Sequence, residues 1–120
     1  MMRKSILVVA LFFSSQFVRA EPLVVTSMTE NDRTMTLTFP TEDVKRTNKE
    51  ATLCIEPTGS VTLAKLWMPD HGHGSTPTSL VGMENDCVRV ERLNFVMLGH
   101  WDLQVSFTDG DRGVLSFEVV

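Results

Sequence analysis

Beyond residue 20, apolar and polar residues alternate along much of the chain, which is the pattern of β-strands with one buried face. Met35, Leu37 and Phe39 alternate with threonines, and a period of two sends successive side chains to opposite faces of a strand. Further alternating or short apolar runs cover residues 52–55, 61–66, 79–83, 88–91, 102–107 and 114–119. No run has a sustained helical period, and the polar residues 41–50 suit at most a turn or a short helix.

Turn-forming residues separate these runs. Glycine and proline lie within 57–60 and 109–113, and Glu-Asn-Asp triplets occupy 30–32 and 84–86; both compositions favour tight turns. About seven short antiparallel strands with regular turns predict an all-β fold, an immunoglobulin-like β-sandwich. A small β-barrel is the alternative.

The first twenty residues have the parts of a secretory signal. Arg3 and Lys4 precede an apolar stretch from Ile6 to Phe13, and the segment closes with Val18-Arg19-Ala20. An uncleaved membrane anchor is the alternative, but Ser14-Ser15-Gln16 interrupts the apolar run well short of the roughly 18 residues that span a bilayer. We therefore predict a signal peptide at 1–20 and a periplasmic or secreted domain at 21–120, with no transmembrane segment after cleavage.

Cleavage changes the charge and the interpretation of the cysteines. It removes three of the eleven basic residues and none of the fifteen acidic ones, so the net charge falls from −4 to −7. This acidic balance argues against a nucleic-acid binder, which needs a basic face. In an oxidising compartment, Cys54 and Cys87 are expected to form a disulfide, closing a loop of about 33 residues. Reactive or metal-binding thiols are the alternative, although neither cysteine lies in a CxxC motif.

All three histidines lie close to methionines, in two loops. The loops read Met68-Pro69-Asp70-His71-Gly72-His73-Gly74 and Met97-Leu98-Gly99-His100-Trp101. Gly72 allows the backbone to bend so that the two flanking imidazoles can face one point. Thioethers favour Cu(I), whereas imidazoles bind copper and zinc, and Asp70 could add an oxygen ligand or orient a histidine. If 79–83 is a strand, the chain crosses the sandwich twice between the loops, which brings both loops to the same pole.

Structural roles are the alternatives for each of these residues. Met68 and Met97 could cap the core, Trp67 and Trp101 could belong to it, and His71-Gly72-His73 could be a solvated loop. Asp109, Asp111 and Arg112 are interpreted as turn residues.

The two loops resemble the YtkA-like domain family. Residues 64–74 resemble its A-x-V-x-x-x-MPxHGHG segment, and 95–105 resemble its F-x-MPGxW-x-L-x-V segment, with Leu98 in place of proline. The closing Phe117-Glu118-Val119 also fits, so the resemblance covers about 51–119. These domains are similar to FixH-type proteins, whose membrane anchor is missing here. The resemblance implies an immunoglobulin-like sandwich, a link to copper handling, and ligands Met68, His71 and His73 with Met97 near. The role of His100 as a ligand is not implied by the resemblance and is our inference alone.

Sequence motifs for catalysis are missing: there is no G-x-S-x-G, no ordered Ser/His/Asp set and no phosphate-binding glycine loop. We therefore expect a non-enzyme, a soluble periplasmic copper-binding domain that acts as a carrier or buffer. Its ligands would be Met68, His71 and His73, with Met97 and His100 as weaker candidates, and its partner a copper-donating or copper-accepting envelope protein. The alternative is a metal-free module that binds a protein or envelope partner through the same loops.

Overall fold

The computed structural model describes residues 21–120, apart from the side chains of Met83 and Glu84; the predicted signal peptide lies outside this range. The described chain contains strands and no helix, and therefore no helix able to cross a membrane. The strands are β1 (Leu23–Met28), β2 (Thr34–Phe39), β3 (Ala51–Glu56), β4 (Val61–Met68), β5 (His73–Gly74), β6 (Ser79–Glu84), β7 (Cys87–Glu91), β8 (Gly99–Phe107) and β9 (Arg112–Val119).

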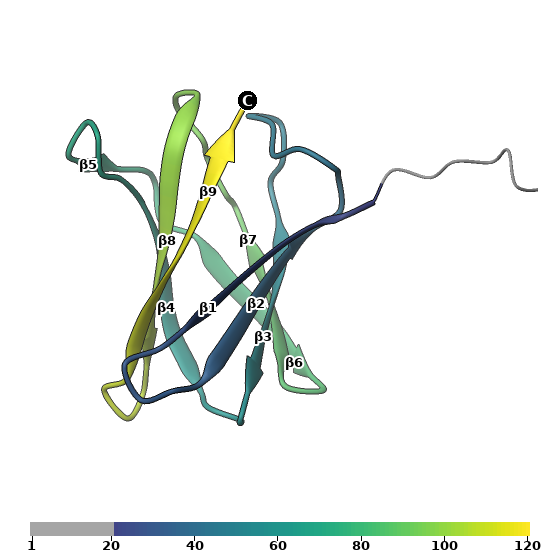
Figure 1. Cartoon of the computed structure of the whole chain (residues 1–120), viewed down its shortest axis with the longest axis vertical. Helices are drawn as coiled ribbons and strands as arrows, with labels where there is room; N and C mark the ends of the chain where they lie inside the picture. The colour runs from purple at the N-terminus through teal and green to yellow at the C-terminus, as the bar shows by residue number, and fades with distance from the viewer. Residues whose placement is uncertain (1–20) are drawn as a thin grey trace, which may run out of the picture.

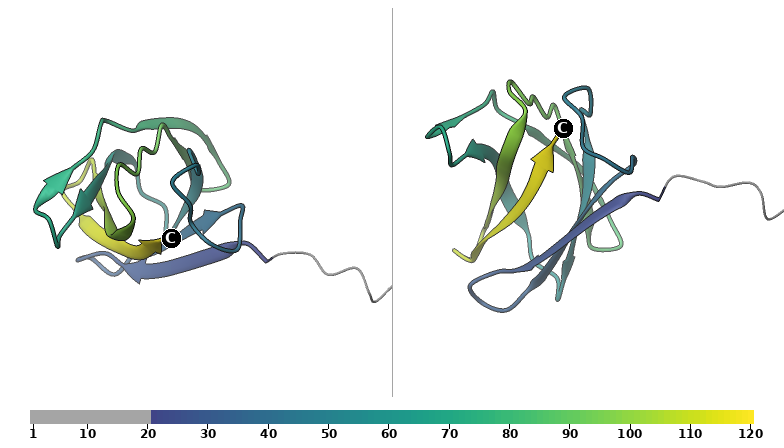
Figure 2. Two further views of the ribbon diagram at one scale, coloured as in Figure 1. Left: turned by 90° about the horizontal axis from the view of Figure 1, so that it is seen from above. Right: turned by 45° about the horizontal axis from the view of Figure 1, so that its top comes forward.

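Two antiparallel sheets face each other, as Figures 1 and 2 show. One sheet has the strand order β1-β2-β3-β7-β6 and the other β5-β4-β8-β9. The prediction of an all-β sandwich is thus confirmed, and the seven predicted runs are all strands. The strand β1 was not predicted because Leu23–Met28 does not alternate clearly: Val24 and Met28 are about half exposed. The two-residue β5 is too short to leave a pattern.

Alternating residues from both sheets form the core between them. Met35, Leu37 and Phe39 are buried, as their spacing predicts, and Trp101 is the largest fully buried side chain. Edge-to-face contacts of its ring with Phe95, and of Phe95 with Phe117, connect β8, β9 and the loop before β8. In β4, a bulge between Val61 and Leu63 shifts the alternation, so Leu63 is half exposed.

The disulfide Cys54–Cys87 is present, which confirms the predicted pairing. It joins residues that lie directly opposite each other on β3 and β7, within a single sheet. Both cysteines are half-buried on the outer face, because their neighbours Leu53, Ile55 and Val88 point into the core.

The turn at 109–111 does more than reverse the chain. Asp111 is buried, and its carboxylate accepts hydrogen bonds from the Thr29 hydroxyl at 2.6 Å and the Asn31 amide at 2.9 Å. It also forms an ion pair with Arg33 at 3.0 Å. Its carboxylate therefore links the β8–β9 turn to the β1–β2 turn. Figure 1 shows both turns at the lower end of the molecule, opposite the histidine-containing segments.

Candidate metal site at the loop pole

The two histidine-containing segments lie at the same pole, but only His71 is in a loop: His73 begins β5 and His100 lies near the start of β8, because both residues pair with neighbouring strands. Strand β6 is present over Ser79–Glu84, so the chain crosses the molecule after the first loop and returns along β7. Figure 1 shows the end of β4, the start of β8 and the C-terminus at this upper pole. The argument from two crossings was therefore correct, because the short run 79–83 does form a strand.

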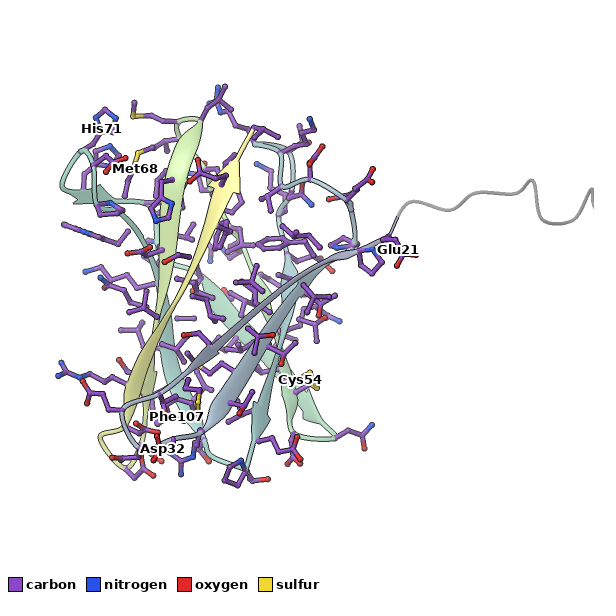
Figure 3. The ribbon with its side chains drawn as sticks, viewed as in Figure 1. Glu21, Asp32, Cys54, Met68, His71 and Phe107 are labelled. Atoms are coloured by element: carbon purple, nitrogen blue, oxygen red, sulfur yellow. A yellow bond between two sulfur atoms is a disulfide. The ribbon has the colours of Figure 1, made fainter. Side chains whose placement is uncertain are left out.

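The first loop is a tight hairpin between β4 and β5. Met68 lies opposite His73 in the strand register, and the Met68 carbonyl accepts hydrogen bonds from the amides of His71 at 3.2 Å and Gly72 at 2.8 Å. Gly72 has a φ of +66°, which closes the turn. Opposed residues of an antiparallel pair present their side chains on the same face, so the Met68 thioether and the His73 imidazole share one face of the hairpin. Figure 3 labels Met68 and His71 at this end.

The two imidazoles of this hairpin form a pair. The ring centroids of His71 and His73 are 5.9 Å apart with 39° between their planes, and His73 also makes an edge-to-face contact with Trp101 at 6.0 Å. The Nδ1 of His73 lies 3.0 Å from the Gly74 carbonyl oxygen. Because a carbonyl only accepts, Nδ1 carries the proton and Nε2 of the neutral ring carries the lone pair. Metal-binding histidines are oriented by the same kind of hydrogen bond.

The two methionines differ in exposure. Met68 is 1% exposed and packs against Gly99, where an added Cβ would lie 3.0 Å from Met68 Cε. Met97 is 36% exposed, and its carbonyl accepts a hydrogen bond from Trp101 Nε1 at 2.9 Å. Met68 thus borders the core, as expected if it caps the core, and it lies on the face that carries His73. Met97 instead lies on the surface of the second loop.

His100 lies on the other face of β8. Its neighbour Trp101 points into the core, so His100 points outward, where Nδ1 is 2.6 Å from Glu118 Oε2 and Nε2 is 3.3 Å from Asp102 Oδ1. The hydrogen bond with Glu118, and then the charges of Asp102, Glu118 and Asp70, raise the pKa of His100 against the effect of burial. The structure therefore groups His100 with carboxylates and does not bring it to His71 and His73.

Sequence spacing alone could have identified Asp102 as a partner of His100, but neither Glu118 nor the apolar surface of the second loop. Asp102 is two residues from His100 and hence on the same face, but Glu118 becomes its neighbour through the pairing of β8 with β9. The second loop exposes three consecutive apolar residues, Val96, Met97 and Leu98, which the sequence analysis had not treated as a group.

Among the described side chains, no three from His, Cys, Asp and Glu lie close enough together to hold a metal ion. The donors nearest to the imidazole pair along the chain are the thioether of Met68, which is on the same face, and the exposed carboxylate of Asp70. Comparisons with protein-family models, curated proteins and solved structures gave no match, so the resemblance to YtkA-like domains stays a prediction.

Proposed function

We propose that the protein is an exported, soluble copper-binding domain that acts as a carrier or buffer of Cu(I). His71 and His73 supply imidazole nitrogens, and the thioethers of Met68 and Met97 supply sulfur. The observation that carries the proposal is the hairpin itself: the imidazoles lie 5.9 Å apart, with Met68 opposite His73. A mixed nitrogen and thioether set suits Cu(I), since soft thioether ligands select that ion.

The position of the pair suits a carrier. His71 is exposed and His73 half-exposed, so copper at their nitrogens would stay accessible to a copper-donating or copper-accepting envelope protein. The Gly74 carbonyl fixes the His73 ring and leaves its Nε2 for a ligand bond. His100 is not among the proposed ligands, because both of its nitrogens face carboxylates.

Cu(I) competition titration tests this function, with ascorbate as the reductant because a thiol would attack the disulfide. We expect one Cu(I) per chain, bound more tightly than about 1 μM. His71→Ala with His73→Ala abolishes this binding, and Met68→Leu, which keeps the buried volume, weakens it about tenfold. His100→Ala is the matched control and keeps the wild-type affinity. Binding weaker than micromolar, or a double variant that still binds, would overturn the proposal.

A second candidate function is a metal-free module that binds a protein or envelope partner. It is favoured by the exposed tip Val96-Met97-Leu98, whose side chains are 41%, 36% and 57% exposed. Runs of exposed apolar residues often mark interaction sites. If Met97→Ser with Leu98→Ser abolishes capture of an envelope partner while His71→Ala with His73→Ala leaves capture and metal uptake unchanged, this second function is correct.

A further inference from the structure

We propose that the disulfide is a thiol–disulfide exchange site, at which the thiolate of a dithiol reductant attacks Cys87 Sγ. The first reason is its location. Cys54 and Cys87 are half-buried on the outer side of one sheet, instead of lying between the sheets. Figure 3 labels Cys54 on this sheet. A thiol can therefore reach the sulfurs in the folded protein, and access is a first requirement for exchange.

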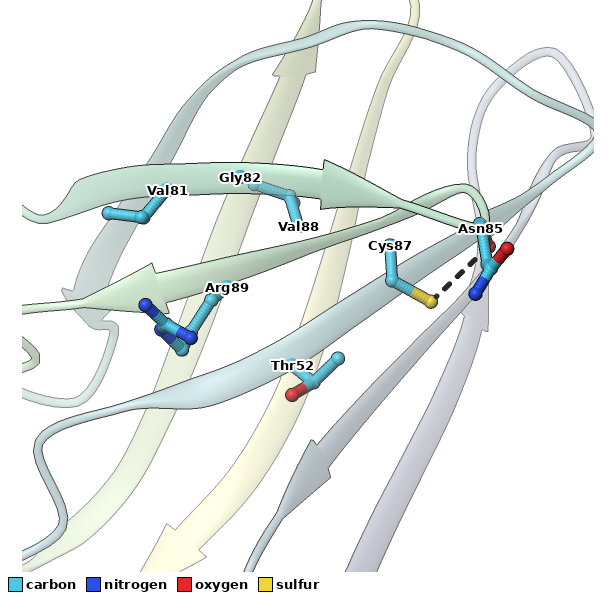
Figure 4. Close-up of a pocket in the computed structure, with 7 residues that line it drawn as sticks. All are labelled: Thr52, Val81, Gly82, Asn85, Cys87, Val88 and Arg89. Atoms are coloured by element: carbon cyan, nitrogen blue, oxygen red, sulfur yellow. Dashed lines mark hydrogen bonds between the residues drawn. The ribbon is translucent and has the colours of Figure 1, made fainter.

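A hollow leads to one of the two sulfurs. A cavity of about 330 Å³ is lined by Cys87, Thr52, Gly82 and Arg89, which Figure 4 shows around the Cys87 side chain. Gly82 lies at a bulge of β6 with a φ of +62°, and a Cβ placed there would meet nothing within 4 Å. The missing side chain thus helps to keep open the approach to Cys87.

The charges on the two sides of the disulfide differ. Among the described side chains that line the hollow at Cys87, Arg89 alone is charged. Its Nε also forms an ion pair with Glu91 Oε2 at 2.5 Å. A second hollow of about 240 Å³ reaches Cys54 and is lined by the acidic residues Glu56 and Asp86. A thiolate is attracted by the cation and repelled by the carboxylates, so the approach to Cys87 is favoured.

The reaction transfers two electrons and two protons to the protein. The first thiolate of the reductant forms a bond to Cys87 Sγ, the Cys54–Cys87 bond breaks, and Cys54 leaves as a thiolate that takes up a proton. The second thiol of the reductant, as a thiolate, then attacks its own partner sulfur in the mixed disulfide. The Cys87 thiolate leaves and is protonated, and the dithiol has become a disulfide.

Trapping of the mixed disulfide tests the site of attack. The folded protein is treated briefly with reduced glutathione, which has no second thiol in the same molecule to resolve the mixed disulfide, and is quenched early with an alkylating reagent. Peptide mapping by mass spectrometry is expected to find glutathione on Cys87 and the alkyl group on Cys54. Glutathione on Cys54, or no adduct until the protein unfolds, would overturn the proposal.

Two matched variants test the route. Thr52 lines the hollow at Cys87 and Thr36 the hollow at Cys54, both on the outer face of the same sheet. Thr52→Phe is expected to slow reduction by dithiothreitol about tenfold because access is blocked, whereas Thr36→Phe leaves the rate unchanged. Urea unfolding confirms that both variants are folded. Equal rates in the two variants, or slowing only by Thr36→Phe, would contradict attack at Cys87.

Discussion

The environment of each histidine is set by the face of the strand on which it lies. His73 contacts Trp101 on the core side of the sheet, whereas His100 meets Glu118 and Asp102 on the outer side. The sequence predicts that both residues lie at one pole, but the contact of His100 with Glu118 depends on the pairing of β8 with β9, which joins residues 18 positions apart. Local spacing contains no information on such a long-range partner.

The pH titration of His100 tests its carboxylate contacts. Its pKa is expected above 6.5, chiefly because of the hydrogen bond with Glu118. A raised pKa in the folded state means that this contact adds stability fully below the unfolded-state pKa and that the gain is lost as pH rises through the folded-state pKa. In Glu118→Gln, an NMR titration should give a lower midpoint for His100. An unchanged midpoint would show that Glu118 is not the cause.

Asp111 makes the opposite contribution to pH dependence. Burial disfavours its carboxylate, but hydrogen bonds from Thr29, from the Asn31 and Arg112 amides and from Arg33 outweigh burial and lower its pKa. A lowered pKa gives stability that is present above the unfolded-state pKa and lost as pH falls through the folded-state value. Urea unfolding into the acid range should therefore lose less stability in Asp111→Asn than in the wild type. Equal losses in both would contradict this role.

Strands were the most predictable elements, because a period of two was visible wherever one face is buried. The prediction missed β1, since Leu23–Met28 places Val24 and Met28 on its exposed face. It also could not find the contact between the β1–β2 turn and β9, where Glu30 N donates to Arg112 O at 2.8 Å and holds the two sheets together on one side of the sandwich. This contact depends on the twist of two sheets and not on local pattern.

Gly113 permits this close approach. A Cβ there would lie 2.5 Å from Cε of the buried Met35 and 3.2 Å from the Thr29 backbone. Gly113→Ala should therefore lower the free energy of unfolding by about 1–3 kcal/mol through overpacking. Its neighbour Val114 is 43% exposed, so Val114→Ala serves as the control and should stay within about 0.5 kcal/mol. Equal unfolding midpoints in urea for the two variants would argue against close packing of Gly113 on Met35 and Thr29.

At the scale of the whole molecule, the two poles of the sandwich differ. At one pole Asp111 joins the β8–β9 turn to the β1–β2 turn, and the other pole carries the histidine-containing segments. The disulfide encloses a segment with a sequence separation of 33, from β3 to β7, that includes the His71–His73 hairpin. The sequence predicted the pairing of the cysteines from their number and compartment. That the bridge lies within one sheet follows from the adjacency of β3 and β7, which cysteine spacing does not determine.

The disulfide should contribute substantially to global stability. Replacing both cysteines, Cys54→Ser with Cys87→Ser, removes the closure of a 33-residue loop and should lower the free energy of unfolding by about 3–4 kcal/mol in the chain-entropy description. Because the bridge lies on the outer face, the core should stay packed and the unfolding transition cooperative. Calorimetry of both forms measures the difference, and equal melting temperatures would contradict the prediction.

X-ray absorption at the copper edge of the Cu(I)-loaded protein tests the proposed function most directly. We predict a first coordination shell with two imidazole nitrogens and at least one sulfur, and loss of the nitrogen signal in His71→Ala with His73→Ala. Because Cys54 and Cys87 are joined as a disulfide, that sulfur would come from a methionine. A shell of nitrogen and oxygen alone, unchanged in the double variant, would contradict a thioether–imidazole copper site at this pole.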